Sequence, residues 1–173
     1  LALHDALPIS PRDYHRVHMP LDGKLLRAIY IPGELFSVNP LYVKNIPELF
    51  SRNERLCCIF DTKVGKIAIV FVGATIVRSI ITSWDGTVAP QKFPQLNPVS
   101  YTKRNITFQK GDEIGKFAMG STIICLFEKN KINFSYLSNE KQIFMGEKIA
   151  VIKNIKATPK VIKNKTKTSK AIK

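Results

Sequence analysis

The sequence has few cysteines and no long apolar segment. Its three cysteines, Cys57, Cys58 and Cys125, are odd in number and form no Cys-x-x-Cys pair. This favours a reducing compartment and a role as small buried hydrophobic residues. No run of about 18 apolar residues is present that could span a membrane. We therefore expect a soluble or peripheral protein, and 173 residues, 45% of them hydrophobic, suffice for one well-packed domain.

Acidic residues are absent from the C-terminal segment, residues 151–173. This segment contains eight lysines, which leaves +6 for the rest of a chain whose formal net charge is +14. It also lacks aromatic residues, so we predict a basic, disordered tail. Contact with anionic lipid headgroups is a second hypothesis for the tail. RNA binding is a third, but nothing in the segment can stack on bases, and we predict no nucleic-acid partner.

The N-terminal segment LALHDALPIS does not continue the pattern that follows it. Its residues His-Asp-Ala-Leu-Pro-Ile resemble a translated sequencing adapter, so we predict that residues 1–10 are a non-native leader fused to a truncated reading frame. We leave this segment out of the fold prediction and assign no functional role to His4 or Asp5.

Short apolar runs of strand length dominate the rest of the sequence. They are separated by Gly, Pro, Asn and Asp, which predicts a mainly β fold, a single antiparallel β-sandwich domain with a few short helices. Residues 39–54 can hold only a short helix because Pro47 interrupts them, and residues 91–105 are predicted to form a long loop. The predicted strands are Leu25–Ile31, Leu56–Phe60, Ile67–Val72, Ser79–Trp84, Ile114–Met119, Thr122–Phe127 and Ile132–Leu137.

A Gly-Ser-Thr triplet interrupts the apolar run between Phe117 and Phe127. The triplet is Gly120-Ser121-Thr122. Glycine within a strand pattern costs stability and marks a bulge or a close backbone approach. We therefore expect the backbone at Ser121 to need unusual freedom.

The two histidines outside the leader, His15 and His18, both lie in PRDYHRVHMP. The simplest interpretation is an exposed polar turn between Pro11 and Pro20. His-x-x-His with no further His and no nearby Cys is a poor match to zinc-ligand spacing, so we predict no metal. In a regular strand the two rings would face opposite sides, because side chains alternate. A site that uses both histidines would need a bulge or a turn.

Five blocks of sequence, in this order, resemble the phosphatidylserine decarboxylase family from about Pro11 to about Ala150. They are PRDYHRVHMP, IPGELFSVNP, LFSRNER, VGATIV and KGDEIGKFAMGSTIICLF. The resemblance implies that residues 11–150 are the catalytic domain of an N-terminally truncated proenzyme. It also implies self-cleavage between Gly120 and Ser121 into a large and a small chain.

The resemblance implies a role for each candidate residue. Ser121 is the nucleophile of self-cleavage and becomes the pyruvoyl group, which forms a Schiff base with the substrate and replaces an external cofactor. His18 is the base for self-cleavage, because a serine hydroxyl needs an adjacent base. His15 is the proton donor and contacts the substrate. Asp13 and Arg16 are candidate orienting or charge partners.

The implied function is that of a carboxy-lyase, which converts phosphatidylserine to phosphatidylethanolamine. The implied partners are phosphatidylserine, an anionic membrane surface and further copies of the chain in a homo-oligomer. The implied location is peripheral, on the cytoplasmic face of the cell membrane.

The sequence departs from the family pattern in two ways. In the family an aspartate upstream of PRDYHRVHMP orients the base, but that segment and the N-terminal helices that seat longer members on the membrane are absent here. We do not promote Asp5 in its place. Arg78 stands where the family usually has glycine, which adds bulk and charge near a tight turn.

Two other classes of protein remain as alternatives. KGDEIGKF, residues 110–117, also resembles the β-sandwiches of biotinyl and lipoyl carrier domains, so a non-catalytic carrier or interaction module is one alternative. Against it, no lysine lies at a hairpin tip in the context that such carriers use. A basic RNA-binding protein is the other, and it depends on the tail alone.

Overall fold

The computed structural model describes residues 2–9, 14–75, 79–89, 91, 94–118, 121–134 and 143–153, with the backbone alone described for 2–9 and 121. The helices are α1 (Pro40–Asn45) and α2 (Leu49–Arg52). The strands are β1 (Ala2–Ile9), β2 (Arg16–His18), β3 (Gly23–Ile31), β4 (Arg55–Thr62), β5 (Gly65–Val72), β6 (Ile80–Thr82), β7 (Gly86–Ala89), β8 (Asn97–Ser100), β9 (Thr107–Phe108), β10 (Glu113–Phe117), β11 (Ser121–Phe127), β12 (Ile132–Asn133) and β13 (Val151–Ile152).

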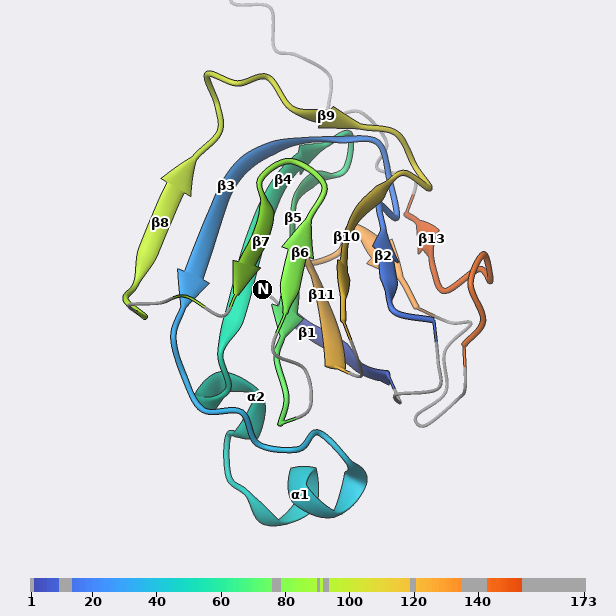
Figure 1. The fold of residues 1–173 in the computed structure, drawn as a ribbon. Coiled ribbons are helices and arrows are strands. Elements are labelled where there is room, and N and C mark those ends of the chain that lie inside the picture. The colour runs from blue at the N-terminus through green and yellow to red at the C-terminus, as the bar shows by residue number, and fades with distance from the viewer. Residues whose placement is uncertain are drawn as a thin grey trace, which may run out of the picture.

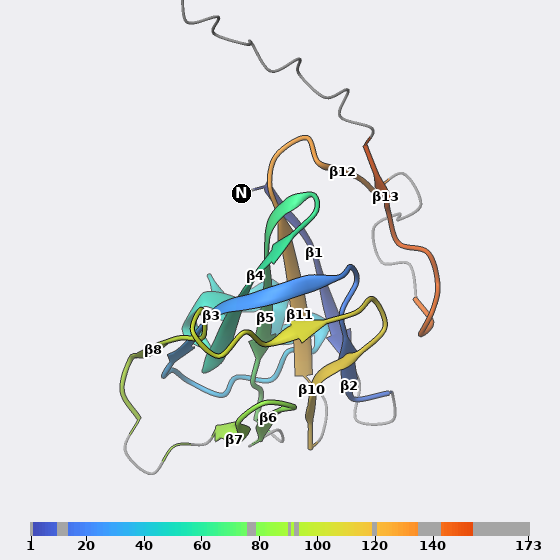
Figure 2. The ribbon, with the colours of Figure 1, turned by 90° about the horizontal axis from the view of Figure 1, so that it is seen from above.

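Two antiparallel sheets face each other in the structure (Figures 1 and 2). The larger sheet has the strand order β1-β11-β5-β4-β3-β8, and β9 also pairs with β3. The smaller sheet has the order β2-β10-β6-β7, and β12 and β13 form a separate two-stranded ribbon. The predicted mainly β sandwich with short helices is therefore confirmed.

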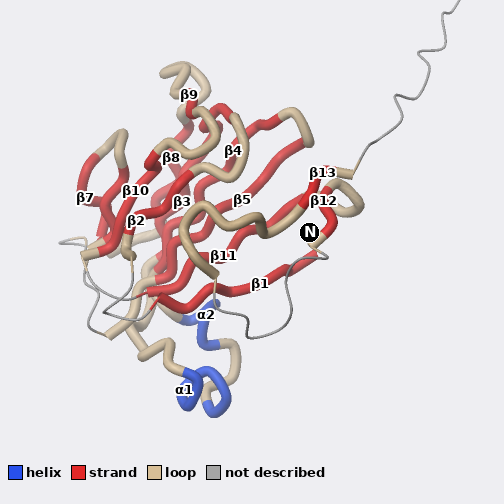
Figure 3. Tube along the Cα trace, turned by 90° about the vertical axis from the view of Figure 1, so that its right-hand side faces the viewer, coloured by secondary structure: helices blue, strands red, loops and turns tan. Residues whose placement is uncertain are grey.

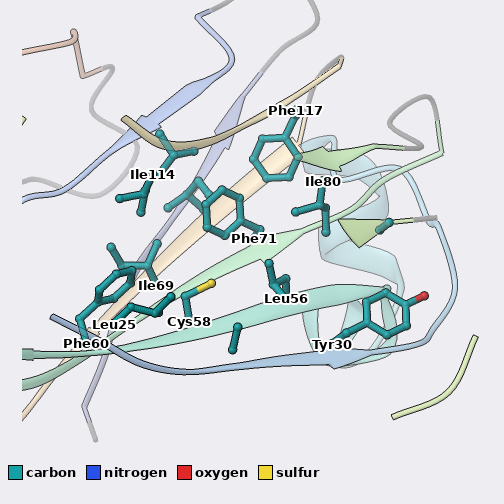
Figure 4. Close-up of a cluster of buried hydrophobic side chains, with 14 of the residues drawn as sticks. Leu25, Tyr30, Leu56, Cys58, Phe60, Ile69, Phe71, Ile80, Ile114 and Phe117 are labelled. Atoms are coloured by element: carbon teal, nitrogen blue, oxygen red, sulfur yellow. The ribbon is translucent and has the colours of Figure 1, made fainter. Parts of the chain in front are cut away.

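The core lies between the two sheets (Figure 4). Strands β4 and β5 turn alternate side chains toward it, as expected for the period of a strand. From the smaller sheet, Ile80, Ile114 and Phe117 meet them, and the Phe71 and Phe117 ring centroids are 5.5 Å apart. Burial of each such side chain contributes about 1.5–3 kcal/mol. The β4 and β5 residues that belong to this core cluster are Leu56, Cys58, Phe60, Ile67, Ile69 and Phe71, each at most 2% exposed.

The prediction of an uninterrupted loop over residues 91–105 is wrong for residues 97–100. These residues form β8, an edge strand paired with β3, as Ala28 opposite Val99 illustrates. All four β8 residues are exposed, so the strand carries no apolar periodicity that a sequence could reveal. Pro98 is compatible with the strand because an edge position needs fewer backbone hydrogen bonds.

Both ends of the described chain contribute strands that the sequence did not predict. Residues 2–9, within the predicted leader, form β1 and pair with β11 from Ala2 opposite Phe127 to Ile9 opposite Ser121. Residues 151 and 152, the first two of the predicted tail, form β13 and pair with β12. Residues 154–173 lie outside the described residues, and the non-native origin of residues 1–10 stays a prediction.

A buried asparagine ties together one end of the sandwich. The side chain of Asn53, which is 0% exposed, donates from Nδ2 to the carbonyls of Phe36 and Gly73, both at 2.8 Å, and accepts from the Phe36 N–H at 3.0 Å. These bonds join the end of α2 to the loop after β3 and to the end of β5. The backbone packs closely here, since a Cβ added at Gly33 would lie 2.3 Å from the Arg52 carbonyl oxygen.

We expect Asn53→Ala to destabilise the fold by about 3 kcal/mol, because it removes the hydrogen bonds of one buried and two partly buried backbone groups. Asn45→Ala is the matched control, since Asn45 is exposed and its Nδ2 donates only to the Leu41 carbonyl at 2.7 Å among the bonds found. The control should change stability by no more than about 0.5 kcal/mol. Urea unfolding monitored by circular dichroism measures both, and equal losses in the two variants would contradict the role given to Asn53.

Candidate functional site

Ser121 and Thr122 of the Gly-Ser-Thr triplet open the strand that follows the passage of the chain from one sheet to the other. β10, in the smaller sheet, ends at Phe117, and β11, in the larger sheet, begins at Ser121. Ser121 pairs with Ile9 of β1, and Thr122 pairs with Val72 of β5. The apolar run around the triplet is therefore two strands rather than one. Met119 and Gly120 lie outside the described residues.

Ser121 starts its strand at the end of the sandwich that carries the helices (Figures 1 and 3). The neighbouring Thr122 pairs with Val72, the last residue of β5. Val72 in turn pairs with Arg55, the first residue of β4. Since α2 ends at Arg52, just before β4, the two helices extend from this same end. Ser121 therefore lies at the helical end of the sandwich.

His15 lies toward this end of the smaller sheet. Its carbonyl accepts a hydrogen bond from the N–H of Phe117, the last residue of β10, at 3.0 Å. Its side chain is half-buried and falls on the same side of the strand as the buried Val17 and Met19. His15 is thus held beside the point where the chain leaves β10 for Ser121.

His18 lies at the other end of β2. It pairs with Glu113, which precedes Phe117 by four residues, or about 13 Å of strand. Its ring stacks on that of Tyr14, with centroids 5.7 Å apart. Side chains alternate in a regular strand, which would put the two histidine rings on opposite sides, but His15 precedes β2. A register shift is also present nearby, between Glu113 and Gly115 of β10.

The hydrogen bonds of His18 fix the proton positions on its neutral ring. Nδ1 lies 2.7 Å from the Gly111 carbonyl oxygen, which can only accept, so Nδ1 carries the hydrogen. Nε2 lies 2.8 Å from the Tyr14 hydroxyl and accepts from it. This leaves Nε2 as the basic nitrogen. The Gly111 carbonyl occupies the side of the ring that an orienting carboxylate occupies in an acid-histidine-nucleophile arrangement.

A tight turn before β10 presents the carbonyl of Gly111. The φ angle of Gly111 is +95°, a left-handed conformation that favours glycine. Its N–H donates to the Met19 carbonyl at 2.8 Å, and the Met19 N–H donates to the Asp112 carbonyl at 2.9 Å. The contact of His18 with Gly111 was not predicted, because 93 residues separate them.

Arg16 forms an ion pair with Glu113 rather than with a histidine among the contacts found. The two side chains approach to 2.6 Å, and the hydrogen bond and charge of Glu113 raise the pKa of Arg16. Both groups are partly open to solvent, so the pair contributes little to stability. Asp13 and Arg78 lie outside the described residues, and the roles predicted for Asp13, His15, His18, Gly120 and Ser121 stay predictions.

In the described part of the chain, no group of three or more His, Cys, Asp or Glu side chains is placed to hold a metal ion. None of the helices there is long and apolar enough to cross a membrane.

Comparison with known proteins finds one family. The sequence profile of phosphatidylserine decarboxylase matches residues 6–151. Three curated relatives are named phosphatidylserine decarboxylase proenzyme. The one from Photobacterium profundum is 53% identical over 148 residues, which are 83% of this chain and 51% of the relative. Those from Francisella philomiragia and Dechloromonas aromatica are 47% and 48% identical, over 83% of this chain and 52% and 51% of the relatives. The chain thus spans about half the length of these relatives.

We expect nitrogen-15 NMR at alkaline pH to show His18 in the form that carries its hydrogen on Nδ1, because the Gly111 carbonyl requires a donor there. Tyr14→Phe removes the hydroxyl at Nε2 but keeps the ring and the carbonyl, so the hydrogen should stay on Nδ1. A dominant Nε2–H form in the unaltered chain would show that the ring does not bind Gly111 in solution.

Proposed function

The chain belongs to the phosphatidylserine decarboxylase family, and on this premise we propose that the protein containing it decarboxylates phosphatidylserine to phosphatidylethanolamine. The observation that carries the proposal is the position of Ser121, within the matched residues, at the start of β11, the strand that follows β10 of the other sheet. The family match includes residues 110–117, the segment that suggested a carrier module, so it counts against that alternative.

We propose that Ser121 cuts the chain in which it lies. Its Oγ loses a proton to a base and attacks the Gly120 carbonyl carbon, so the peptide bond breaks, an ester forms, and the freed nitrogen takes up a proton. Elimination then breaks the ester and leaves a carboxylate on Gly120 and dehydroalanine at residue 121. Water hydrolyses the imine tautomer of that residue to a pyruvoyl group and ammonia. The step needs no oxidant, since atoms and electrons balance with one water.

Pyruvoyl is the cofactor that this reaction would leave at residue 121. When present, it supplies an electron sink for the loss of carbon dioxide. Its position fits the fold, because residue 121 opens β11 at the helical end of the sandwich, where His15 is held by the end of β10. A substrate amine could therefore approach from that end without crossing the core.

The two histidines would serve different steps. His15, near the end of β10, is the proposed proton donor and substrate contact. His18 is the proposed base for self-cleavage, and Nε2 is the nitrogen that would take the proton. A base must come within about 3 Å of the hydroxyl oxygen. Residues 14–18 would therefore have to rearrange, with the Tyr14 hydroxyl giving up Nε2, before His18 could act on Ser121.

The remaining features of the proposal concern assembly and location. The large and small chains would stay associated, in a homo-oligomer peripheral to the cytoplasmic face of the cell membrane. The basic residues 154–173 would contact anionic lipid there, because lysines near such a surface are attracted to it.

We expect self-cleavage when this chain is extended at its N-terminus with the corresponding segment of the Photobacterium profundum relative. Intact mass under denaturing conditions should show a small chain of 53 residues, Ser121–Lys173, with a pyruvoyl N-terminus. Ser121→Ala should remain one chain, because it removes the nucleophile. The control Ser100→Ala changes an exposed serine of β8 and should process normally. Two chains from Ser121→Ala would refute the proposed cleavage.

We expect the two histidine variants to fail at different stages in the same extended chain. His18→Ala should yield little pyruvoyl protein, because the base is lost. His15→Ala should process at least in part, yet decarboxylate phosphatidylserine about 10²–10⁴-fold more slowly, as is typical for loss of one general acid. Carbon dioxide release per mole of pyruvoyl separates the two stages. A parent rate per pyruvoyl group in His15→Ala would remove that residue from the proton-donor role.

A further inference from the structure

Helix α1 exposes large apolar side chains to solvent. None of its residues is buried, and Leu41, Tyr42 and Val43 are 67%, 43% and 38% exposed. Three consecutive helical residues spread over about 200° around the axis, at about 100° per residue. They cannot all pack against one face of the protein, so the apolar surface surrounds the helix instead of forming one stripe toward the core.

The helix is nevertheless well formed and well attached. Asn39 caps it, since its Oδ1 accepts from the Tyr42 N–H at 3.0 Å, and Pro40 occupies the start of the helix, where its missing N–H costs nothing. The Ile46 N–H donates to the Tyr42 carbonyl at 2.8 Å at the other end. The exposed side chains therefore sit on an ordered support, and their exposure does not come from a frayed segment.

The charge and composition of α1 match a bilayer surface. Within Pro40–Asn45 the charged residue is Lys44, and no acidic residue is present. Leucine and valine partition into the acyl boundary, tyrosine is enriched at the headgroup level, and a lysine stem can extend along apolar surface to reach a phosphate. The positive charge is opposite in sign to that of anionic lipid.

The location of α1 ties this surface to the candidate site. Both helices extend from the end of the sandwich at which Ser121 begins β11 (Figures 1 and 3). The buried Asn53 network fixes α2 to that end, and only Ile46, Pro47 and Glu48 separate the two helices. A bilayer in contact with α1 would therefore lie at the end of the sandwich where a phospholipid headgroup must arrive.

We propose that α1 inserts Leu41, Tyr42 and Val43 into the interfacial region of a phospholipid bilayer and so docks the Ser121 end of the sandwich on the membrane. The inference rests on the proposed function only for the identity of the lipid substrate. The exposed apolar side chains of α1 are its physical basis. Lys44 would remain at the level of the headgroup phosphates.

The test is cosedimentation of the 173-residue chain with vesicles of equal parts phosphatidylcholine and phosphatidylglycerol, at high salt to screen the lysine-rich tail. Leu41→Glu and Val43→Glu should each weaken partitioning about tenfold, the effect of losing one buried aliphatic side chain. Ile152→Glu is the matched control for Val43→Glu. Both residues are 38% exposed, but Ile152 lies on β13, whose partner β12 follows the opposite end of β11. The control should bind like the unaltered chain.

Each outcome decides the inference separately from the proposed function, because the vesicles contain no phosphatidylserine. Unchanged binding by both α1 variants, or no binding by the unaltered chain, would overturn it. An α1 variant that altered the oligomeric state without lipid, and left vesicle binding intact, would assign the surface to a second copy and also overturn it. Loss of binding in the α1 variants alone would support the docking role even if the extended chain failed to decarboxylate.

Discussion

The structure depends on burial of one face of each sheet against the other. Phe71 of the larger sheet and Phe117 of the smaller one meet in this layer, and Gly115 allows the contact, because a Cβ there would lie 2.6 Å from the Ile81 carbonyl oxygen and 3.1 Å from the Phe71 ring. A chain that contributes to both sheets can pass between them only at the ends of the strands. One such passage separates the end of β10 at Phe117 from the start of β11, so the backbone at Ser121 lies at the end of the sandwich instead of in its core.

The parts of the fold that follow from burial could be predicted from the sequence. β4 and β5 appear in the sequence as short, continuous apolar runs at residues 56–60 and 67–72, which are typical of buried strands. Burial alternates along β4, with Leu56, Cys58 and Phe60 turned to the core. Edge strands could not be predicted in this way. β8 is exposed at all its residues. Its pairing with β3 is made by backbone groups, so the side chains leave no periodic signal in the sequence.

The candidate site was predictable to a different degree at each residue. Glycine before Ser121 indicated a break in the strand, and the break between β10 and β11 is present. Strand alternation indicated that His15 and His18 would face opposite sides in a regular strand, but the strand begins only at Arg16. The environment of the His18 ring was not predictable, because Gly111 comes from a turn 93 residues away and its role depends on a backbone carbonyl. No side-chain pattern encodes such a contact.

Because β11 pairs with a strand on each side, a cut before Ser121 would not separate the two fragments. β11 is hydrogen-bonded along one edge to β1 and along the other to β5, both of which precede the cut. Its inner side chains Ile123 and Phe127 are each 5% exposed and belong to the shared core. Breaking one covalent bond would leave these contacts intact. The shorter fragment would therefore be retained as an internal strand of a nicked protein, and its release would require unfolding of the larger sheet.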